Sequence, residues 1–234
     1  MRSFVDPVSL TTGEISITGE EHHYLGRVRR VRVGQAIELV DGAGKRATAK
    51  IVRMTETETV VEVEEVEEVE EAAPHVRMLL PLIKGDRMDG CLEKLTEVGA
   101  SEMIVWQAER SVVRLDAAKR DARVAHYAGV VAAAARQCGR ARVPGLRFTA
   151  TLREVLRALP VGDRFVLDPT AERGQPTGAA DVTLISGPEG GFSWVELDQL
   201  ATAGFLALGL GPRVLRADTA PIVAAALIRA ATAS

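Results

Sequence analysis

The chain has 234 residues and a mass of 25.1 kDa, with 47% hydrophobic and 26% charged residues. This composition is typical of globular proteins that bury a core, and it excludes a mainly disordered chain. Two cysteines are too few for a disulfide scaffold, no apolar run reaches the ~20 residues that cross a bilayer, and the first residues lack an apolar signal segment. We therefore expect a cytoplasmic protein without a membrane anchor.

Charge is distributed unevenly along the chain, although the formal net charge is only −3. Residues 56–71 contain nine glutamates and no Lys or Arg, so 29 basic and 23 acidic residues remain elsewhere, a balance of +6. Such a balance permits a basic surface that binds nucleic acid, but a solvated face is the favoured explanation of any single basic run. The two basic runs are Arg27, Arg29, Arg30 and Arg32, and Arg136, Arg140, Arg142 and Arg147.

Short strands dominate the first 72 residues. Alternating apolar and polar residues predict strands at 36–40, 47–54 and 59–66, with a glycine turn at 41–44. Valines alternate with glutamates in the last strand, as expected of a strand with one wet face, although the run is also compatible with a linker. Short strands with glycine turns favour a small β-barrel over residues 1–72.

Residues 73–234 alternate between strands and helices. This order predicts an α/β domain with a mostly parallel sheet covered on both faces. Gly99 and Gly139 are expected at helix ends, and Ser193 with Glu196 forms a capping-box pattern. Strands are predicted at 76–83, 103–106, 164–167, 182–186 and 205–208, and helices at 86–98, 116–138, 152–159, 194–203 and 221–231.

Two glycine-rich segments follow successive predicted strands, at residues 186–192 and 208–216. In parallel sheets, ligands bind beyond the carboxyl ends of the strands, and glycines let the backbone approach a ligand closely. Neither segment has the spacing of a phosphate-binding fingerprint. Plain turn geometry explains one such segment, but two in succession beside Glu189, Arg213, Arg216 and Asp218 favour a binding site. On spacing alone, Asp218 serves a site or caps the last helix.

Other reactive side chains show no arrangement that indicates chemistry. The four histidines lack the spacing of a zinc site, so we expect no metal, and a serine nucleophile motif is absent. Cys91 shares a helical apolar stripe with Met88 and Leu95, which predicts core packing. Trp106 and Trp194 are also interpreted as packing residues. An aromatic content of 4% argues against a stacking platform like that of an RRM domain.

The ordered motifs of the chain resemble the bacterial ribosomal RNA small subunit methyltransferase E family of the SPOUT superfamily. The resemblance covers nearly the whole chain and is strongest at Gly-Pro-Glu-Gly-Gly-Phe-Ser (187–193), Leu208-Gly209, and Val-Leu-Arg-Ala-Asp-Thr-Ala (214–220). Lys84, residues 93–99, Arg110-Ser111, His23 and residues 28–34 support it.

The resemblance implies a PUA-like barrel followed by a SPOUT α/β domain with a deep trefoil knot. It also implies a homodimer, S-adenosylmethionine as methyl donor, and N3 of a uridine in 16S rRNA of the small ribosomal subunit as acceptor. The donor-binding residues expected from motif position are Leu167, Ser186, Gly187, Pro188, Glu189, Gly190, Gly191, Leu208, Gly209, Leu210, Gly211, Arg213, Val214, Leu215 and Arg216.

Three positions depart from the family pattern. Asp218 stands where the family usually has Glu, residues 136–138 read Arg-Gln-Cys in place of Glu-Gln-Ser, and residues 28–30 read Val-Arg-Arg in place of Val-Leu-Arg. The second departure removes a carboxylate, so we assign no catalytic role to that position.

Uridine N3 carries a proton, so the site needs a proton acceptor or a cation that stabilises the uracil anion. We expect Arg216 to stabilise the anion, with Asp218 or Glu189 orienting Arg216 or accepting the proton. The residues expected to contact RNA are Arg27, Arg29, Arg30, Arg32, Lys84 and Arg110.

Three other functions stay open at this point. The first is a SPOUT methyltransferase that acts on tRNA or on another rRNA nucleotide. The second is an RNA-binding ribosome-assembly factor without catalysis. A nucleotide-binding oxidoreductase is the least favoured, because the phosphate fingerprint is missing.

Overall fold

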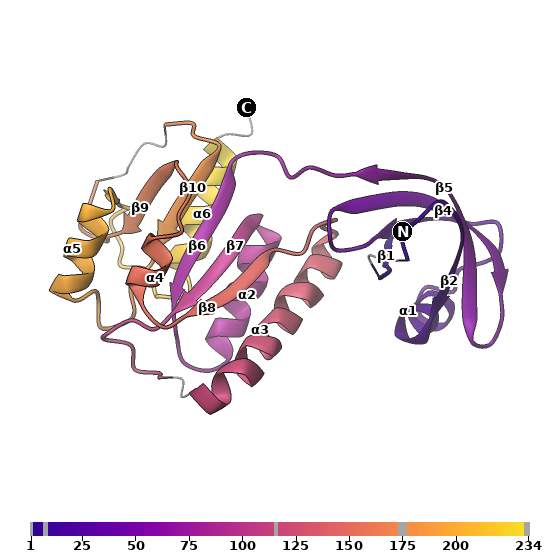
Figure 1. Ribbon diagram of the computed structural model, residues 1–234, viewed down its shortest axis with the longest axis horizontal. Coiled ribbons are helices and arrows are strands. Elements are labelled where there is room, and N and C mark those ends of the chain that lie inside the picture. Colours follow the sequence, from indigo (N-terminus) through magenta and orange to yellow (C-terminus); the bar gives the residue numbers. More distant parts are fainter. Residues whose placement is uncertain (1, 7–8, 115–116, 173–176, 232–234) are drawn as a thin grey trace. The chain divides into compact units, whose positions relative to one another are not determined.

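The structure is a computed structural model that describes residues 2–6, 9–114, 117–172 and 177–231 (Figure 1). The chain divides into two compact units, residues 1–71 with 135–143, and residues 72–134 with 144–234. The first crossing between the units lies next to the expected boundary at residue 72. Among the described helices, none is long and apolar enough to cross a membrane.

The first unit is built on a five-stranded sheet in the order β1-β3-β4-β5-β2. The glutamate run forms β5 and pairs with both β2 and β4, so the linker interpretation is wrong. Ile37, Leu39, Ile51 and Val61 are buried at the centre of its core. The elements are β1 (Arg2–Phe4), β2 (Gly13–Thr18), the helix α1 (Gly19–His23) with a π-helical turn (Tyr24–Val28), β3 (Ala36–Val40), β4 (Lys45–Met54) and β5 (Glu58–Glu68).

The second unit contains a six-stranded sheet in the order β11-β9-β10-β6-β7-β8, in which every pair is parallel. The α/β prediction is therefore confirmed for this unit. Its strands are β6 (His75–Pro81), β7 (Ala100–Trp106), β8 (Gly145–Thr149), β9 (Asp163–Leu167), β10 (Asp181–Ile185) and β11 (Leu206–Leu208).

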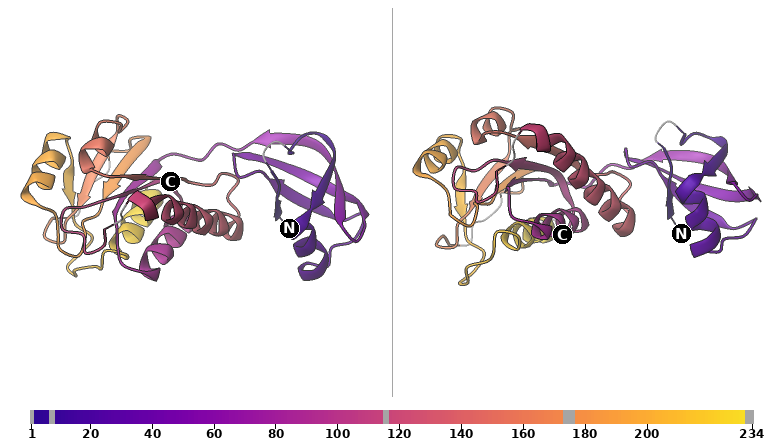
Figure 2. Two further views of the ribbon diagram at one scale, coloured as in Figure 1. Left: turned by 60° about the horizontal axis from the view of Figure 1, so that its bottom comes forward. Right: turned by 90° about the horizontal axis from the view of Figure 1, so that it is seen from below.

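Helices cover both faces of this sheet (Figure 2). α2 and α6 pack on each other and on β6, β7 and β10, whereas α4 and α5 share a separate buried cluster with Leu79, Ile104 and Trp106. The two faces are thus closed by different pairs of helices. The helices are α2 (Asp86–Glu97), α3 (Ala117–Cys138), α4 (Leu152–Leu156), α5 (Trp194–Thr202) and α6 (Ala220–Ala231).

Local sequence signals set several helix ends. Gly99 and Gly139 have φ of 96° and 80°, the left-handed conformation that ends a helix and that glycine adopts without strain. At the start of α5, the Ser193 hydroxyl accepts from the Glu196 backbone N–H and the Glu196 carboxylate accepts from the Ser193 N–H. The predicted capping box is therefore present.

One carboxylate ties three neighbouring strands together. Glu102 on β7 accepts hydrogen bonds from Arg77 on β6 and from Arg147 on β8, the latter at 2.8 Å. Burial pushes the pKa of Glu102 upward, but the two guanidinium groups outweigh it, so the pKa lies below the ordinary value of 4.5. Arg147 is therefore engaged in an internal pair.

Candidate donor site and basic surface

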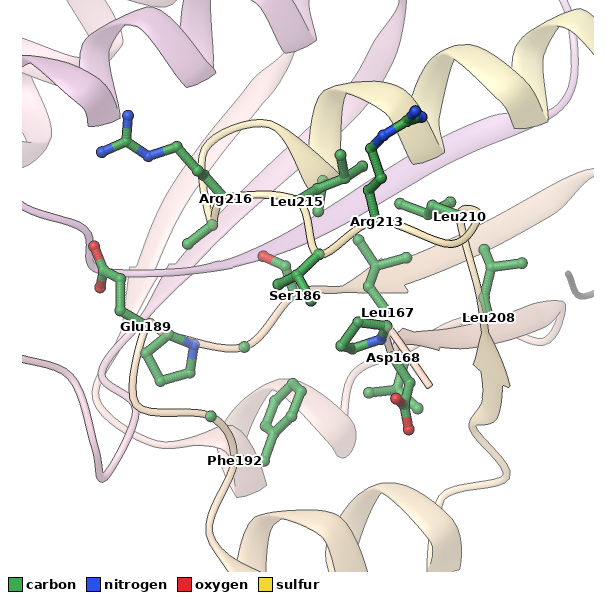
Figure 3. A pocket seen from close by; sticks show the side chains of 18 of the residues that line it. Leu167, Asp168, Ser186, Glu189, Phe192, Leu208, Leu210, Arg213, Leu215 and Arg216 are labelled. Atoms are coloured by element: carbon green, nitrogen blue, oxygen red, sulfur yellow. The ribbon is translucent and has the colours of Figure 1, made fainter. Parts of the chain in front are cut away.

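A pocket of about 620 Å³ opens at the carboxyl ends of three adjacent parallel strands, β9, β10 and β11 (Figure 3). This is where ligands bind in open α/β sheets. Strand pairing sets Leu208 opposite Leu167, and backbone hydrogen bonds from Asp168 N to Leu208 O (3.1 Å) and from Gly209 N to Glu172 O (2.8 Å) join the loops that follow. The pocket walls are therefore positioned by the sheet.

The loop after β10 needs its glycines for close approach. A Cβ on Gly187 would lie 3.0 Å from the Phe192 ring, and one on Gly190 would lie 3.0 Å from the Arg110 carbonyl oxygen. Gly191 has φ of 71° and donates its N–H to the Pro188 carbonyl at 2.8 Å, which closes a tight turn. The loop can therefore follow a bound ligand with its backbone.

The loop after β11 approaches the loop after β9 even more closely. A Cβ on Gly209 would lie 1.9 Å from the carbonyl oxygen of Ala171. No side chain larger than hydrogen fits there unless the backbone moves. Gly209 therefore lets the two loops pack against each other, although it does not itself line the pocket.

Apolar side chains form much of the pocket wall. Phe192 lines the pocket and stacks on the buried Trp106, with ring centroids 6.3 Å apart and an interplanar angle of 11°. Leu167, Leu208 and Leu210 also line it. A flat apolar group such as a nucleobase can fit between such surfaces.

Polar groups at the pocket can accept or donate to a ligand. The Ser186 hydroxyl is buried and has no hydrogen-bond partner among the described residues. One oxygen of Asp168 accepts from both the N–H and the hydroxyl of Thr170 at 2.7 Å, and no partner is seen in the described chain for the other oxygen. A buried polar group without a partner is costly, so Ser186 is a strong candidate for a ligand contact.

The charged residues of the pocket include an ion pair that the sequence did not predict. Arg87, in the first turn of α2, contacts Glu189 in the glycine loop at 3.1 Å. Figure 3 shows Glu189 and Arg216 on one side of the pocket, opposite Leu167, Asp168 and Leu208. The Arg216 carbonyl accepts from Thr219 N and Ala220 N, each at 2.9 Å, so this residue is fixed at the start of α6.

Asp218 does not line this pocket. Its Oδ1 is buried without a hydrogen-bond partner among the described residues. Burial, with a smaller effect of the negative charge of Asp218, raises the pKa of the Cys91 thiol to about 12. Asp218 therefore lies near α2, and Cys91 is buried beside Met88 and Leu95 as predicted.

The structure brings most of the expected donor-site residues together. Gly190, Gly209 and Gly211 do not line the pocket, and the first two instead have backbone as their near neighbour. Three pocket residues were not predicted from the sequence. Asp168 directly follows a predicted strand and Phe192 directly follows a glycine-rich segment, so a signal for each was present. Arg87 has no local sequence signal. The expected residues that line the pocket are Leu167, Ser186, Gly187, Pro188, Glu189, Gly191, Leu208, Leu210, Arg213, Val214, Leu215 and Arg216.

The expected RNA contacts of the second unit lie at the same edge of the sheet as the pocket. Lys84 follows β6 and Arg110 follows β7, and all six strands run parallel. Both side chains are exposed, and neither lines the pocket.

The first unit carries an arginine segment, defined here as Arg27, Arg29, Arg30 and Arg32. All four are exposed, and none forms an ion pair within the described ranges 2–6, 9–114, 117–172 and 177–231. Arg29 lies over the Tyr24 ring and donates to its hydroxyl at 2.7 Å. The segment is thus a concentrated positive charge.

The acidic stretch faces other cations. Glutamates of β5 lie opposite basic residues of β4, with ion pairs from Arg46 to Glu67 at 3.0 Å and from Arg53 to Glu58 at 3.1 Å. These pairs engage Arg46 and Arg53, and neither pair includes a residue of the arginine segment.

The second basic run is engaged within the protein. Arg136 pairs with Glu21 at 3.6 Å and lies over the Phe4 ring, and Arg140 pairs with Glu71. With Arg147 bound to Glu102, three of the four arginines of this run are engaged in ion pairs, whereas Arg142 is exposed.

Comparison with known proteins agrees with this architecture. Residues 70–229 match a family described as RNA methyltransferase domain, and residues 17–64 match one described as RNA methyltransferase PUA domain. The fold and site thus define an RNA methyltransferase domain behind a PUA-like domain.

Individual relatives identify the family within this class of RNA methyltransferases. The chain is 33% identical over 233 residues to ribosomal RNA small subunit methyltransferase E of Mycobacterium tuberculosis, covering 96% of this chain and 89% of the relative. It therefore belongs to the ribosomal RNA small subunit methyltransferase E family.

Solved structures of similar proteins include two with bound donor. One is a methyltransferase from Legionella pneumophila in complex with the cofactor SAM, with a TM-score of 0.82, 32% identity and coverage of 98% of this chain and 97% of that chain. The other is ribosomal RNA small subunit methyltransferase E from Neisseria gonorrhoeae bound to S-adenosyl methionine, with a TM-score of 0.81, 28% identity and the same coverage.

Proposed function

We propose that this protein transfers a methyl group from S-adenosylmethionine to N3 of a uridine in the 16S rRNA of the small ribosomal subunit. The observation that carries the proposal is the pocket at the ends of β9, β10 and β11. It has glycine loops, Arg216 at its edge, and a buried Ser186 hydroxyl with no hydrogen-bond partner in the part of the chain that the structure describes. The two donor-bound structures of similar proteins support the choice of donor.

The pocket residues fit this donor. The apolar walls around Phe192 and Leu208 suit adenine, the free oxygen of Asp168 suits a ribose hydroxyl, and the Ser186 hydroxyl can pair with a polar group of the donor. The donor supplies an activated methyl group on a sulfonium centre, and the residues of the chain position it.

The acceptor chemistry falls to charged residues on the other side of the pocket. Arg216 stabilises negative charge on the uracil oxygens as the N3 proton leaves. Glu189 accepts that proton or orients Arg216, and Arg87 holds the Glu189 carboxylate in place at 3.1 Å. Asp218 lies outside the pocket, so its role is to position the loop before α6.

Replacing Arg216 by alanine tests this assignment. The expected result is a lower kcat with little change in the dissociation constant of the donor, measured by calorimetry. Weaker donor binding with unchanged kcat would instead make Arg216 a donor-binding residue.

The arginine segment is proposed to hold rRNA by its phosphates. Phosphate contacts position the RNA and carry no sequence information, so they leave the choice of uridine to the second unit. Lys84 and Arg110 extend such contacts beside the pocket.

Three further features of the family are proposed for this chain: a closed N-terminal barrel, a trefoil knot and a homodimer. The tight passage of Gly209 against Ala171 supports the knot, because it brings the loop after β11 against the connection that follows β9. A dimer would let the first unit of one subunit present RNA to the pocket of the other. Sedimentation at low micromolar concentration would show the dimer.

Transfer of tritium from labelled S-adenosylmethionine to small ribosomal subunits that lack their native uridine methylation tests the whole proposal. N3-methyluridine in the 16S rRNA, identified by mass spectrometry, is the expected product. Transfer of the label to tRNA, or to another rRNA nucleotide, would show that the acceptor differs from the one proposed. Absence of donor binding would favour an assembly factor without catalysis.

A further inference from the structure

Trp194 was expected to pack in the core, and the structure contradicts this expectation. Its side chain is 83% exposed, whereas Trp106 is fully buried. An indole ring is a large, flat apolar surface with a polar N–H, and tryptophan is enriched at binding interfaces. Trp194 is the first residue of α5, so the apolar face of that helix does not account for the presence of tryptophan at this position.

The backbone around Trp194 is firmly held. The buried Glu196 carboxylate accepts from Ser193 N at 2.7 Å and from Glu109 N at 2.8 Å. Ser193 in turn caps the helix. These bonds fix the backbone that carries the indole and join it to the segment after β7.

Trp194 also lies beside the pocket. Phe192, two residues earlier, lines the pocket. Leu197, three residues later, also lines it, and residues three apart share a face of a helix. Trp194 therefore lies within three residues of two side chains that line the pocket.

Two exposed arginines, Arg110 and Arg114, belong to the segment that Glu196 joins to the start of α5. Glu196 binds the backbone of Glu109, and Gly190 packs against the backbone of Arg110, where a Cβ would lie 3.0 Å from the carbonyl oxygen. Arg114 donates to the Glu109 carbonyl at 3.2 Å. Neither arginine pairs with a carboxylate among the residues the structure describes.

We propose that Trp194 stacks on an unpaired base of the RNA next to the nucleotide being methylated, while Arg110 and Arg114 contact the adjoining phosphates. A flat aromatic ring with cations beside it fits one unpaired nucleotide, whose base stacks on the ring and whose phosphate meets the cations. The inference rests on the proposed function and names how the pocket holds the RNA strand around its target.

Fluorescence of the full-length protein, saturated with S-adenosylmethionine, tests the stacking directly. Titration with single-stranded oligouridylate should quench the exposed indole, and duplex RNA of equal length should quench it much less. Trp194→Phe should lose this quenching but retain binding within a few-fold. Trp194→Ala should bind the oligonucleotide about 5- to 150-fold more weakly, as expected for one lost base stack.

Val161→Ala is the matched control. Val161 is 93% exposed and precedes β9, whereas the pocket lies at the other end of that strand. This variant should bind RNA as the wild type does. All variants should bind S-adenosylmethionine equally, because the indole does not line the pocket.

Two results would overturn the inference while leaving the proposed function intact. One is methylation of small subunits by Trp194→Ala with an unchanged KM and unchanged affinity for oligouridylate. The other is a change in sedimentation of Trp194→Ala without loss of RNA affinity, which would make the ring a contact between copies of the chain. If the wild type neither binds S-adenosylmethionine nor methylates any RNA, the proposed function fails instead.

Discussion

Replacing Glu196 by alanine removes a buried carboxylate that joins three segments of the second unit. Two backbone N–H groups, those of Ser193 and Glu109, lose their acceptor at 2.7 and 2.8 Å. A hydrogen bond to a charged group contributes about 1.5–3 kcal/mol, so we expect a loss of about 3–6 kcal/mol in the free energy of unfolding. That is a large part of the ~5–15 kcal/mol typical of domains.

Urea unfolding followed by circular dichroism measures this loss. Because alanine at this position can prevent folding altogether, Glu196→Gln provides a milder test. The amide keeps one acceptor oxygen but turns an NH2 group toward the second N–H, so its loss should be intermediate. Asp198→Asn, an exposed change on the same helix, is the control. A loss below about 1 kcal/mol for Glu196→Ala would refute the reasoning, because that is the size of an ordinary helix cap alone.

Three further predictions follow from other contacts. Gly209→Ala should sharply weaken S-adenosylmethionine binding in calorimetry, because its Cβ would meet the Ala171 carbonyl, whereas Gly129→Ala in an open helical position should not. Glu102 has a lowered pKa, so its stabilising effect is present above about pH 4.5 and is lost as the pH falls through the lower value of the folded state. The unfolding free energy of Glu102→Gln should therefore fall below that of the wild type at neutral pH and converge with it in acid; a constant difference would contradict this. Reversing charge in the arginine segment should weaken rRNA binding for all sequences and flatten its salt dependence, and unchanged binding would exclude the segment.

Regular patterns made much of the fold predictable. Strands with alternating burial, such as β3, and helices with capping signals, such as α5, lie within a few residues of their expected bounds. β1, β2, α1 and β8 were not predicted. β8 (Gly145–Thr149) has no alternation, because its side chains are all partly or fully exposed, and β1 has only three residues.

Pocket residues that follow strand ends could be predicted from the sequence. Pocket residues brought in by tertiary packing could not. Ser186 and Leu208 follow from the carboxyl-end rule. Arg87 reaches Glu189 across 102 positions of sequence, so no local pattern could pair them. Trp194 was misassigned because an apolar residue at a helix start is read as core, whereas the capping box turns it to solvent.

The segment 135–143 has a consequence for how this protein can be divided. It lies in sequence between the two parts of the second unit, yet Arg2 donates to the Gly139 carbonyl and Gly44 N donates to Ala141 O at 3.1 Å, so it completes the first unit. The polypeptide crosses between the units three times, after residues 71, 134 and 143. A gene fragment that ends near residue 72 would therefore encode an incomplete module. Inheritance of the N-terminal unit alone, or its transfer to another protein, requires a replacement for the nine residues 135–143, which are encoded later in the gene.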